Sequence, residues 1–244
     1  MCLIGFHWRP GTAERLILAG NRDEFRDRPA SPLDWWEGGR ILAGRDLRGG
    51  GTWLGVTRDG RLAALTNHRD PALGKPAAPS RGLLPLRFLQ GGEPAEVFLA
   101  EVRREAGAFS PFNLLLCDGR DLLGYESRRD RLLRFDPGVH VVSNGAFDEP
   151  WPKAAALRAD FAALEHDDEA LLDRLQDART YPDGDLPRTG VPLAWERLLS
   201  AAFIPGETYG TLASTVVRLG RTGGRMAELR HGPQGPEGRT DLAW

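Results

Sequence analysis

Strand-like and helix-like segments alternate in blocks along this chain of 244 residues, and their order limits the fold. Apolar runs at residues 2–9 and 15–20 open the chain, and Asp59-Gly60 supplies a hairpin turn between two later runs. Blocks of strands, helices, strands, helices and strands predict an α+β fold with packed sheets and helices outside. The remaining strands are expected at 41–43, 52–56, 62–66, 112–117, 122–125, 132–135, 139–143, 211–219, 225–230 and 240–244, and the helices at 83–89, 93–106, 151–166, 169–178 and 193–203.

Composition narrows the class of protein. No linker divides the chain, so we predict one domain over residues 1–244. A formal net charge of -2 with no basic block argues against a nucleic-acid partner or an anionic membrane surface. No apolar run approaches the roughly 20 residues that span a bilayer, and no signal peptide is evident. The two cysteines, Cys2 and Cys117, fit a reducing compartment, so a cytoplasmic location is expected.

Cys2 follows the initiator methionine directly. Removal of Met1 would place a thiol and a free α-amine on one residue. The amine has an unperturbed pKa of about 7.7–8.0 and the thiol about 8.5, so a neutral amine can take the thiol proton near pH 7. Enzymes with an N-terminal nucleophile use this arrangement. The alternative is that Cys2 is an ordinary small buried residue.

The second apolar run leads into four polar residues, Asn21-Arg22-Asp23-Glu24. If the two early strands pair, these residues lie beside Cys2. Arg22 could hold a carboxylate through a bidentate fork, and Asp23 could orient the amine. The alternative interpretation is a solvated turn.

Two asparagines stand at the ends of predicted strands, Asn67 and Asn144. Most asparagines in such places are cap or turn residues. An asparagine amide can also donate to a developing oxyanion, an interaction worth about 10²–10³ in rate. Next to a nucleophile, both side chains are therefore candidate oxyanion donors.

The sequence predicts no metal site, because its histidines and cysteines lack the spacing of metal ligands. A single exposed His or Cys could still bind haem iron. The tryptophans belong to the core or line a pocket for an apolar ligand. The Gly-rich turn at 48–53 is either a bend that brings backbone close to a ligand or a turn that starts a strand.

A series of motifs spans nearly the whole chain: Met1-Cys2, Asn21-Arg22-Asp23-Glu24, Gly50-Gly51-Thr52-Trp53, Thr66-Asn67-His68-Arg69, Ser143-Asn144, Pro150-Trp151-Pro152-Lys153, Glu196-Arg197-Leu198-Leu199-Ser200 and Tyr209-Gly210-Thr211. In this order they resemble the NRDE family, also called the transport and Golgi organisation protein 2 family. That family is linked to haem trafficking and to lipid or acyl-CoA homeostasis.

A more distant resemblance is to N-terminal-nucleophile hydrolases of the penicillin V acylase and bile salt hydrolase type. It implies a four-layer αββα sandwich. It also implies that Cys2 is nucleophile and base, that Asp23 orients its amine and that Arg22 supports the thiolate. Asn67 and Asn144 would be the oxyanion donors. The order of Asn, Arg and Asp differs from that group, and its C-terminal Arg has no clear counterpart here.

Two functions follow from these resemblances. The first is an amidohydrolase that cleaves a linear carbon–nitrogen bond and needs no cofactor. The second is a non-catalytic protein that binds or transfers haem or an acyl lipid in the same cleft. In either case the expected partner is a small molecule, and the fold alone does not choose between them.

Overall fold

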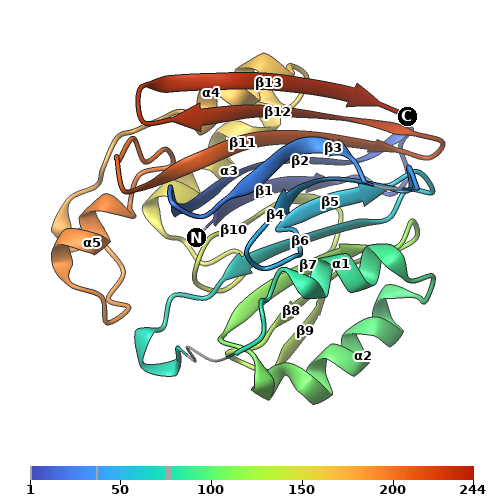
Figure 1. Ribbon diagram of the computed structural model, residues 1–244, viewed down its shortest axis with the longest axis horizontal. Coiled ribbons are helices and arrows are strands. Elements are labelled where there is room, and N and C mark those ends of the chain that lie inside the picture. Colours follow the sequence, from blue (N-terminus) through green and yellow to red (C-terminus); the bar gives the residue numbers. More distant parts are fainter. Residues whose placement is uncertain (1, 37, 75–77) are drawn as a thin grey trace.

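Two antiparallel sheets form the centre of the protein in a computed structural model, which describes residues 2–36, 38–74 and 78–244 (Figure 1). In the first sheet the strand order is β10-β1-β2-β11-β12-β13, and in the second it is β3-β4-β5-β6-β7-β8-β9. The strands are β1 (Cys2–Trp8), β2 (Glu14–Phe25), β3 (Ala30–Trp35), β4 (Ile41–Asp46), β5 (Leu54–Thr57), β6 (Leu62–Asn67), β7 (Phe112–Cys117), β8 (Leu122–Glu126), β9 (Arg131–Arg134), β10 (Gly138–Val142), β11 (Tyr209–Gly220), β12 (Gly224–Gly232) and β13 (Gly235–Ala243).

Helices cover the outer face of each sheet, which gives four layers. α3 and α4 pack on the first sheet, and α1 and α2 pack on the second (Figure 1). The helices are α1 (Leu83–Gln90), α2 (Ala95–Glu105), α3 (Pro152–Leu164), α4 (Asp168–Leu175) and α5 (Leu193–Leu198), with short 3₁₀ turns at Pro71–Leu73, Ala106–Ala108 and Asp183–Asp185. The predicted αββα sandwich is confirmed.

Alternation along each strand produces the layers, because successive side chains point to opposite faces. In β1, Ile4 and Phe6 pack between the two sheets, whereas Leu3 packs under α3 and α4. In β2, Leu16 and Leu18 join the core between the sheets. A third cluster fills the space between the second sheet and α1 and α2.

Some predicted boundaries were wrong. β2 continues through residues 21–24, where a turn was one alternative, and β3 was missed. β3 is an edge strand that contains Pro32, a residue that sheets tolerate at their edges. The helix predicted at 193–203 ends at Leu198. Beyond it, the carbonyls of Ala201 and Ala202 accept hydrogen bonds from side chains of other elements instead of continuing a helical ladder.

Within the part of the chain that the structure describes, no helix is long and apolar enough to cross a bilayer.

Candidate functional site

Cys2 is the first residue of β1, and β1 lies between β10 and β2. Cys2 is paired directly with Arg22 of β2, as expected if the two early strands pair. By strand alternation both side chains point into the space between the two sheets, on the same side as Ile4. The first strand therefore delivers the thiol to the end of the sandwich interior.

The four polar residues at 21–24 belong to β2, so their side chains alternate between two environments. Asn21 lies on the side of the helices and is fully buried. Its Nδ2 donates to the carbonyls of Leu175 and Ala202 at 2.7 and 2.8 Å, and its Oδ1 accepts from Ser214 Oγ at 2.7 Å. Asn21 is thus a structural residue that ties the end of α4 and the segment after α5 to the sheet.

Asp23 is buried on the same side as Asn21. Its Oδ1 accepts a hydrogen bond from Thr211 Oγ1 at 2.7 Å. Burial raises the pKa of Asp23, and the charge of Lys153 acts in the opposite direction. β11 has a register shift between Thr211 and Ala213, directly opposite the step from Arg22 to Asp23. Such bulges commonly redirect side chains beside functional sites.

Lys153 is buried in the first turn of α3. Its Nζ donates to the carbonyl oxygen of Ala201 at 3.3 Å. Burial lowers the pKa of Lys153 to about 8, although the charges of Asp23 and Cys2 favour its protonated form. A buried acid and a buried base therefore lie close to the thiol, which is an arrangement typical of functional sites.

A cavity of about 500 Å³ opens at this end of the sandwich. It lies between the end of the first sheet, the end of the second sheet and the segment that precedes α1. Its lining residues are Cys2, Arg22, Asp23, Glu24, Arg28, Asp46, Arg48, Gly49, Thr52, Trp53, Leu65, Asn67, Ala78, Pro79, Ser80, Arg81, Gly82 and Ser110. We refer to this cavity as the Cys2 cleft.

The cleft brings Cys2, Arg22, Asp23 and Asn67 to one surface. Asn144 is not among its lining residues; it is fully buried behind Asn67. Asn144 Nδ2 donates to the backbone oxygen of Asn67 at 2.8 Å, and the backbone oxygen of Asn144 accepts from Arg69 N at 2.7 Å. The two asparagines are therefore neighbours, with Asn67 exposed to the cleft and Asn144 holding its backbone.

Burial raises the pKa of the Cys2 thiol to about 11, and the charge of Arg22 partly offsets this effect. The thiol is therefore protonated at neutral pH, and a nucleophilic attack requires a nearby group that accepts its proton. Removal of Met1 would free the α-amine of Cys2, which is the group expected to accept this proton. Met1 lies outside the described residues.

Sequence reasoning missed several arginines of the cleft. Arg28 binds Asp46 through two nitrogens at 3.1 and 2.6 Å, so its charge is compensated. Arg81 is half-buried, and its Nη1 donates to the carbonyl oxygen of Pro111 at 3.0 Å. Burial lowers the pKa of Arg81, and the charges of Glu24 and Cys2 act in the opposite direction. No local pattern predicts this placement, because Arg81 reaches the cleft only through the fold.

The Gly-rich turn at 48–53 has a structural reason. A Cβ atom on Gly51 would lie 2.2 Å from the backbone oxygen of Gly82, so only glycine allows this close approach. Thr52 N donates to the same oxygen at 3.1 Å. The turn thereby holds the segment before α1 against the cleft. The close approach of the turn is to the backbone of this segment and not to a ligand.

Metal-binding groups of three or more side chains are not found among the described residues. His7 Nδ1 is hydrogen-bonded to Glu165, and His140 Nδ1 lies 2.8 Å from Asp148 Oδ2. His231 contacts Ser214, and burial lowers the pKa of His231 to about 4. None of these three histidines lines the Cys2 cleft.

Residues 1–228 match the family model described as "Transport and Golgi organisation 2". The chain belongs to the Transport and Golgi organisation 2 family. The homologue from Bos taurus is 32% identical over 249 residues, which cover 91% of this chain and 90% of that protein. The Homo sapiens homologue is 31% identical over 251 residues, with the same coverage.

Solved structures similar to this Transport and Golgi organisation 2 member share its sandwich fold. The C2A mutant of the conjugated bile acid hydrolase from Clostridium perfringens matches with a TM-score of 0.50 and 9% identity, over 99% of this chain and 92% of that one. Penicillin V acylase from Agrobacterium tumefaciens matches with a TM-score of 0.46 and 12% identity, over 98% and 85%. At such identities the likeness concerns the fold alone.

Proposed function

We propose that this protein is an N-terminal-nucleophile amidohydrolase in which Cys2, freed by removal of Met1, cleaves a linear carbon–nitrogen bond. The observation that carries the proposal is the position of the thiol. Cys2 is paired with Arg22 and shares a cleft with Asn67. Asp23, one residue further along β2, is buried and lines the same cleft.

In the first half of the reaction, the α-amine of Cys2 takes the thiol proton and Sγ attacks the amide carbonyl carbon. The carbonyl oxygen becomes an oxyanion, which the Asn67 amide can stabilise by donating a hydrogen bond. The carbon–nitrogen bond then breaks, and the ammonium of Cys2 returns the proton to the departing nitrogen. An amine leaves, and the acyl group remains on Sγ as a thioester.

In the second half, the amine takes a proton from water, and the resulting hydroxide attacks the thioester. The carbon–sulfur bond breaks, the carboxylic acid leaves and the proton returns to Sγ. The net change is amide plus water to acid plus amine. Arg22 favours the thiolate at both stages, since its charge lowers the pKa of Cys2. Asp23 favours the protonated amine.

Two measurements on the purified, untagged protein test the proposal. Intact mass is expected to show the loss of Met1, and a panel of fluorogenic acyl anilides is expected to reveal turnover that Cys2→Ala lacks. Retention of Met1 would remove the base from this mechanism. Equal turnover by wild type and Cys2→Ala would show that Cys2 is not the nucleophile.

Binding of haem or an acyl lipid in the same cleft is the second candidate function. Trp53 and Leu65 are the large apolar side chains of its lining, and they would contact such a ligand. The many charged groups of the cleft favour a polar substrate, and hence catalysis, over this alternative. A haem titration tests it: a saturable Soret shift that disappears in Cys2→Ala would support a haem protein, and no shift at micromolar haem would exclude this version.

A further inference from the structure

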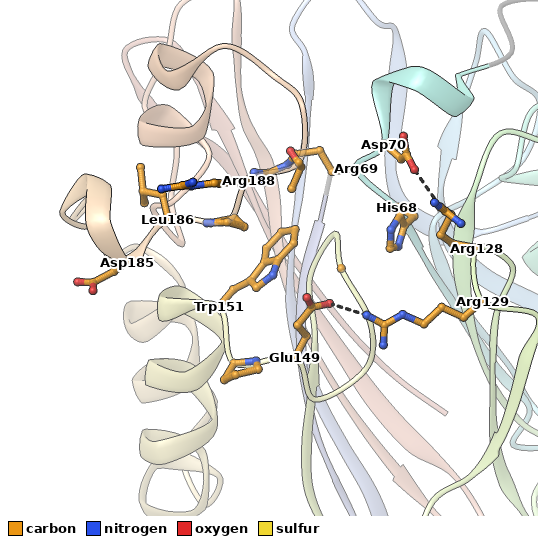
Figure 2. A pocket seen from close by; sticks show the side chains of 14 residues that line it. His68, Arg69, Asp70, Arg128, Arg129, Glu149, Trp151, Asp185, Leu186 and Arg188 are labelled. Atoms are coloured by element: carbon orange, nitrogen blue, oxygen red, sulfur yellow. Dashed lines mark hydrogen bonds and ion pairs between the residues drawn. The ribbon is translucent and has the colours of Figure 1, made fainter.

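A second cavity, of about 640 Å³, lies at the same end of the sandwich (Figure 2). It shares no lining residue with the Cys2 cleft, although both border the end of β6. Asn67 lines the cleft, and the next residue, His68, lines the second cavity. The lining residues are His68, Arg69, Asp70, Arg128, Arg129, Gly145, Glu149, Pro150, Trp151, Asp185, Leu186, Pro187, Arg188 and Thr189.

Two arginines of the turn between β8 and β9 form one wall. Arg128 Nε donates to Asp70 at 2.9 Å, and Arg129 Nη2 lies 3.7 Å from Glu149. Both arginine side chains are about half exposed, at 48% and 51%. Each acid therefore orients one side of a guanidinium, and the remaining N–H groups can serve a ligand.

Arg188 lies on the wall opposite Arg128 and Arg129 (Figure 2). Within residues 2–36, 38–74 and 78–244, no hydrogen bond or ion pair engages its guanidinium. Asp185, from the same loop, also lines the cavity, but its carboxylate points away from Arg188 in Figure 2. Guanidinium groups therefore lie on both walls of the cavity. The charge of Arg188 is the one that no carboxylate of the described residues compensates.

Trp151 and His68 supply the remaining surface between these walls (Figure 2). The Arg69 guanidinium, which also lines the cavity, lies 4.9 Å from the centre of the Trp151 ring, and Glu196 holds this guanidinium at 2.6 Å. His68 Nδ1 is buried and has no hydrogen-bond partner in the described part of the chain. Burial lowers the pKa of His68 and so favours its neutral imidazole, in which one nitrogen donates and the other accepts a hydrogen bond.

We infer that this second cavity binds an aromatic anion, that is, a flat ring that carries a carboxylate or phosphate group. The ring would stack beside Trp151, and the anion would bind the guanidinium of Arg188, on the side of Trp151 away from Glu149 and Arg129 (Figure 2). Guanidinium groups suit both anions because of their planar, bidentate donors. The volume is that of sites for small molecules. The inference does not depend on the chemistry of Cys2.

Calorimetric titration with 2-naphthoate tests the site, with the neutral 2-naphthalenemethanol as the matched ligand. Saturable binding of naphthoate is expected, and the alcohol should bind about tenfold more weakly or worse, since it lacks the charge. Arg188→Gln should raise the Kd for naphthoate by roughly tenfold, whereas Arg129→Gln, which removes a guanidinium that faces Glu149, should change the Kd less. Arg188 is exposed and unpaired among the described residues, so its substitution leaves the fold intact.

Two control variants locate the binding. Arg221→Gln removes an exposed arginine from the turn after β11, and Arg81→Gln removes one from the Cys2 cleft; both should leave the Kd within about twofold. Absence of saturable binding, or equal affinity for the alcohol, would overturn the inference. So would an unchanged Kd in Arg188→Gln, or loss of binding in Arg81→Gln.

Discussion

The two ends of the sandwich each contain a buried cysteine and an arginine of β2, and they differ in what surrounds them. At one end Cys117 closes β7 inside the core between the sheets. Arg15 covers that end by donating to the carbonyls of Gly119 and Gly60 at 2.6 and 3.0 Å. At the other end Cys2 and Arg22 border an open cleft.

Burial alone does not distinguish a structural thiol from a candidate nucleophile. Burial raises the pKa of Cys2 and of Cys117 to about 11. The two cysteines differ in the arginine nearby. The guanidinium of Arg15 donates to two backbone carbonyls, whereas Arg22 has no hydrogen bond or ion pair within the described residues. Only Cys2 has the space, an amide donor and a buried acid within its surroundings.

The largest expected effect separates the two cysteines. Cys2→Ala should lower turnover of a responsive acyl anilide by about 10³-fold or more, because the nucleophile is lost. Cys117→Ala should keep wild-type kcat and lose about 1 kcal/mol of unfolding free energy through its smaller side chain. Steady-state rates and urea denaturation measure these effects. A comparable loss of rate in both variants would erase the distinction between the two ends.

The next effect concerns the asparagines behind the cleft. Asn67→Ala should lower kcat by about 10²–10³-fold, because it removes an oxyanion donor. If Asn144 acts by positioning Asn67, the double variant should lose no more kcat than Asn67→Ala alone. Multiplicative losses would instead give Asn144 a separate role.

A pH effect is expected at the open end because of Lys153. Its folded pKa of about 8 lies below the ordinary 10.5, so between these values the unfolded chain binds more protons than the folded one. The cost of burying the charge is fully present below pH 8, and the unfolding free energy should rise as pH increases from 8 toward 10. The slope of this contribution is at most about 1.4 kcal/mol per pH unit.

Urea denaturation of wild type and Lys153→Met between pH 7.5 and 9.5 measures this contribution. Wild type should gain stability relative to the variant as the pH rises. The Cys117→Ala protein, which retains Lys153, should follow the wild-type slope. Parallel curves for wild type and Lys153→Met would show that Lys153 has an ordinary pKa.

The smallest effects compare the two arginines of β2. Arg15→Met should cost about 1–3 kcal/mol of unfolding free energy, because two carbonyls lose their donors, and it should not change kcat/KM. Arg22→Met should cost less than about 0.5 kcal/mol and lower kcat/KM, since the thiol loses its supporting charge. A lower kcat/KM in Arg15→Met, together with a larger loss of unfolding free energy in Arg22→Met, would contradict a structural role for Arg15 and a functional role for Arg22.

The sequence predicted the layers and the proximity of Cys2 to Arg22, because two early apolar runs must pair. It did not reveal that residues 21–24 form a strand, because their polar side chains interrupt the alternating pattern. In the fold, Asn21 donates to carbonyls at the end of α4 and in the segment after α5, both distant in sequence. Lys153 and Arg81 reach the site from far along the chain, so local periodicity carries no signal for their roles.

The most direct test of the central claim is to trap the acyl intermediate. The protein would be incubated with an activated acyl ester, quenched in acid and analysed by intact mass and peptide mapping. The account predicts one acyl group on Cys2 of a chain that lacks Met1, and an unmodified Cys117. An acyl group on Cys117, or an unreactive Cys2 in a chain that has lost Met1, would contradict it.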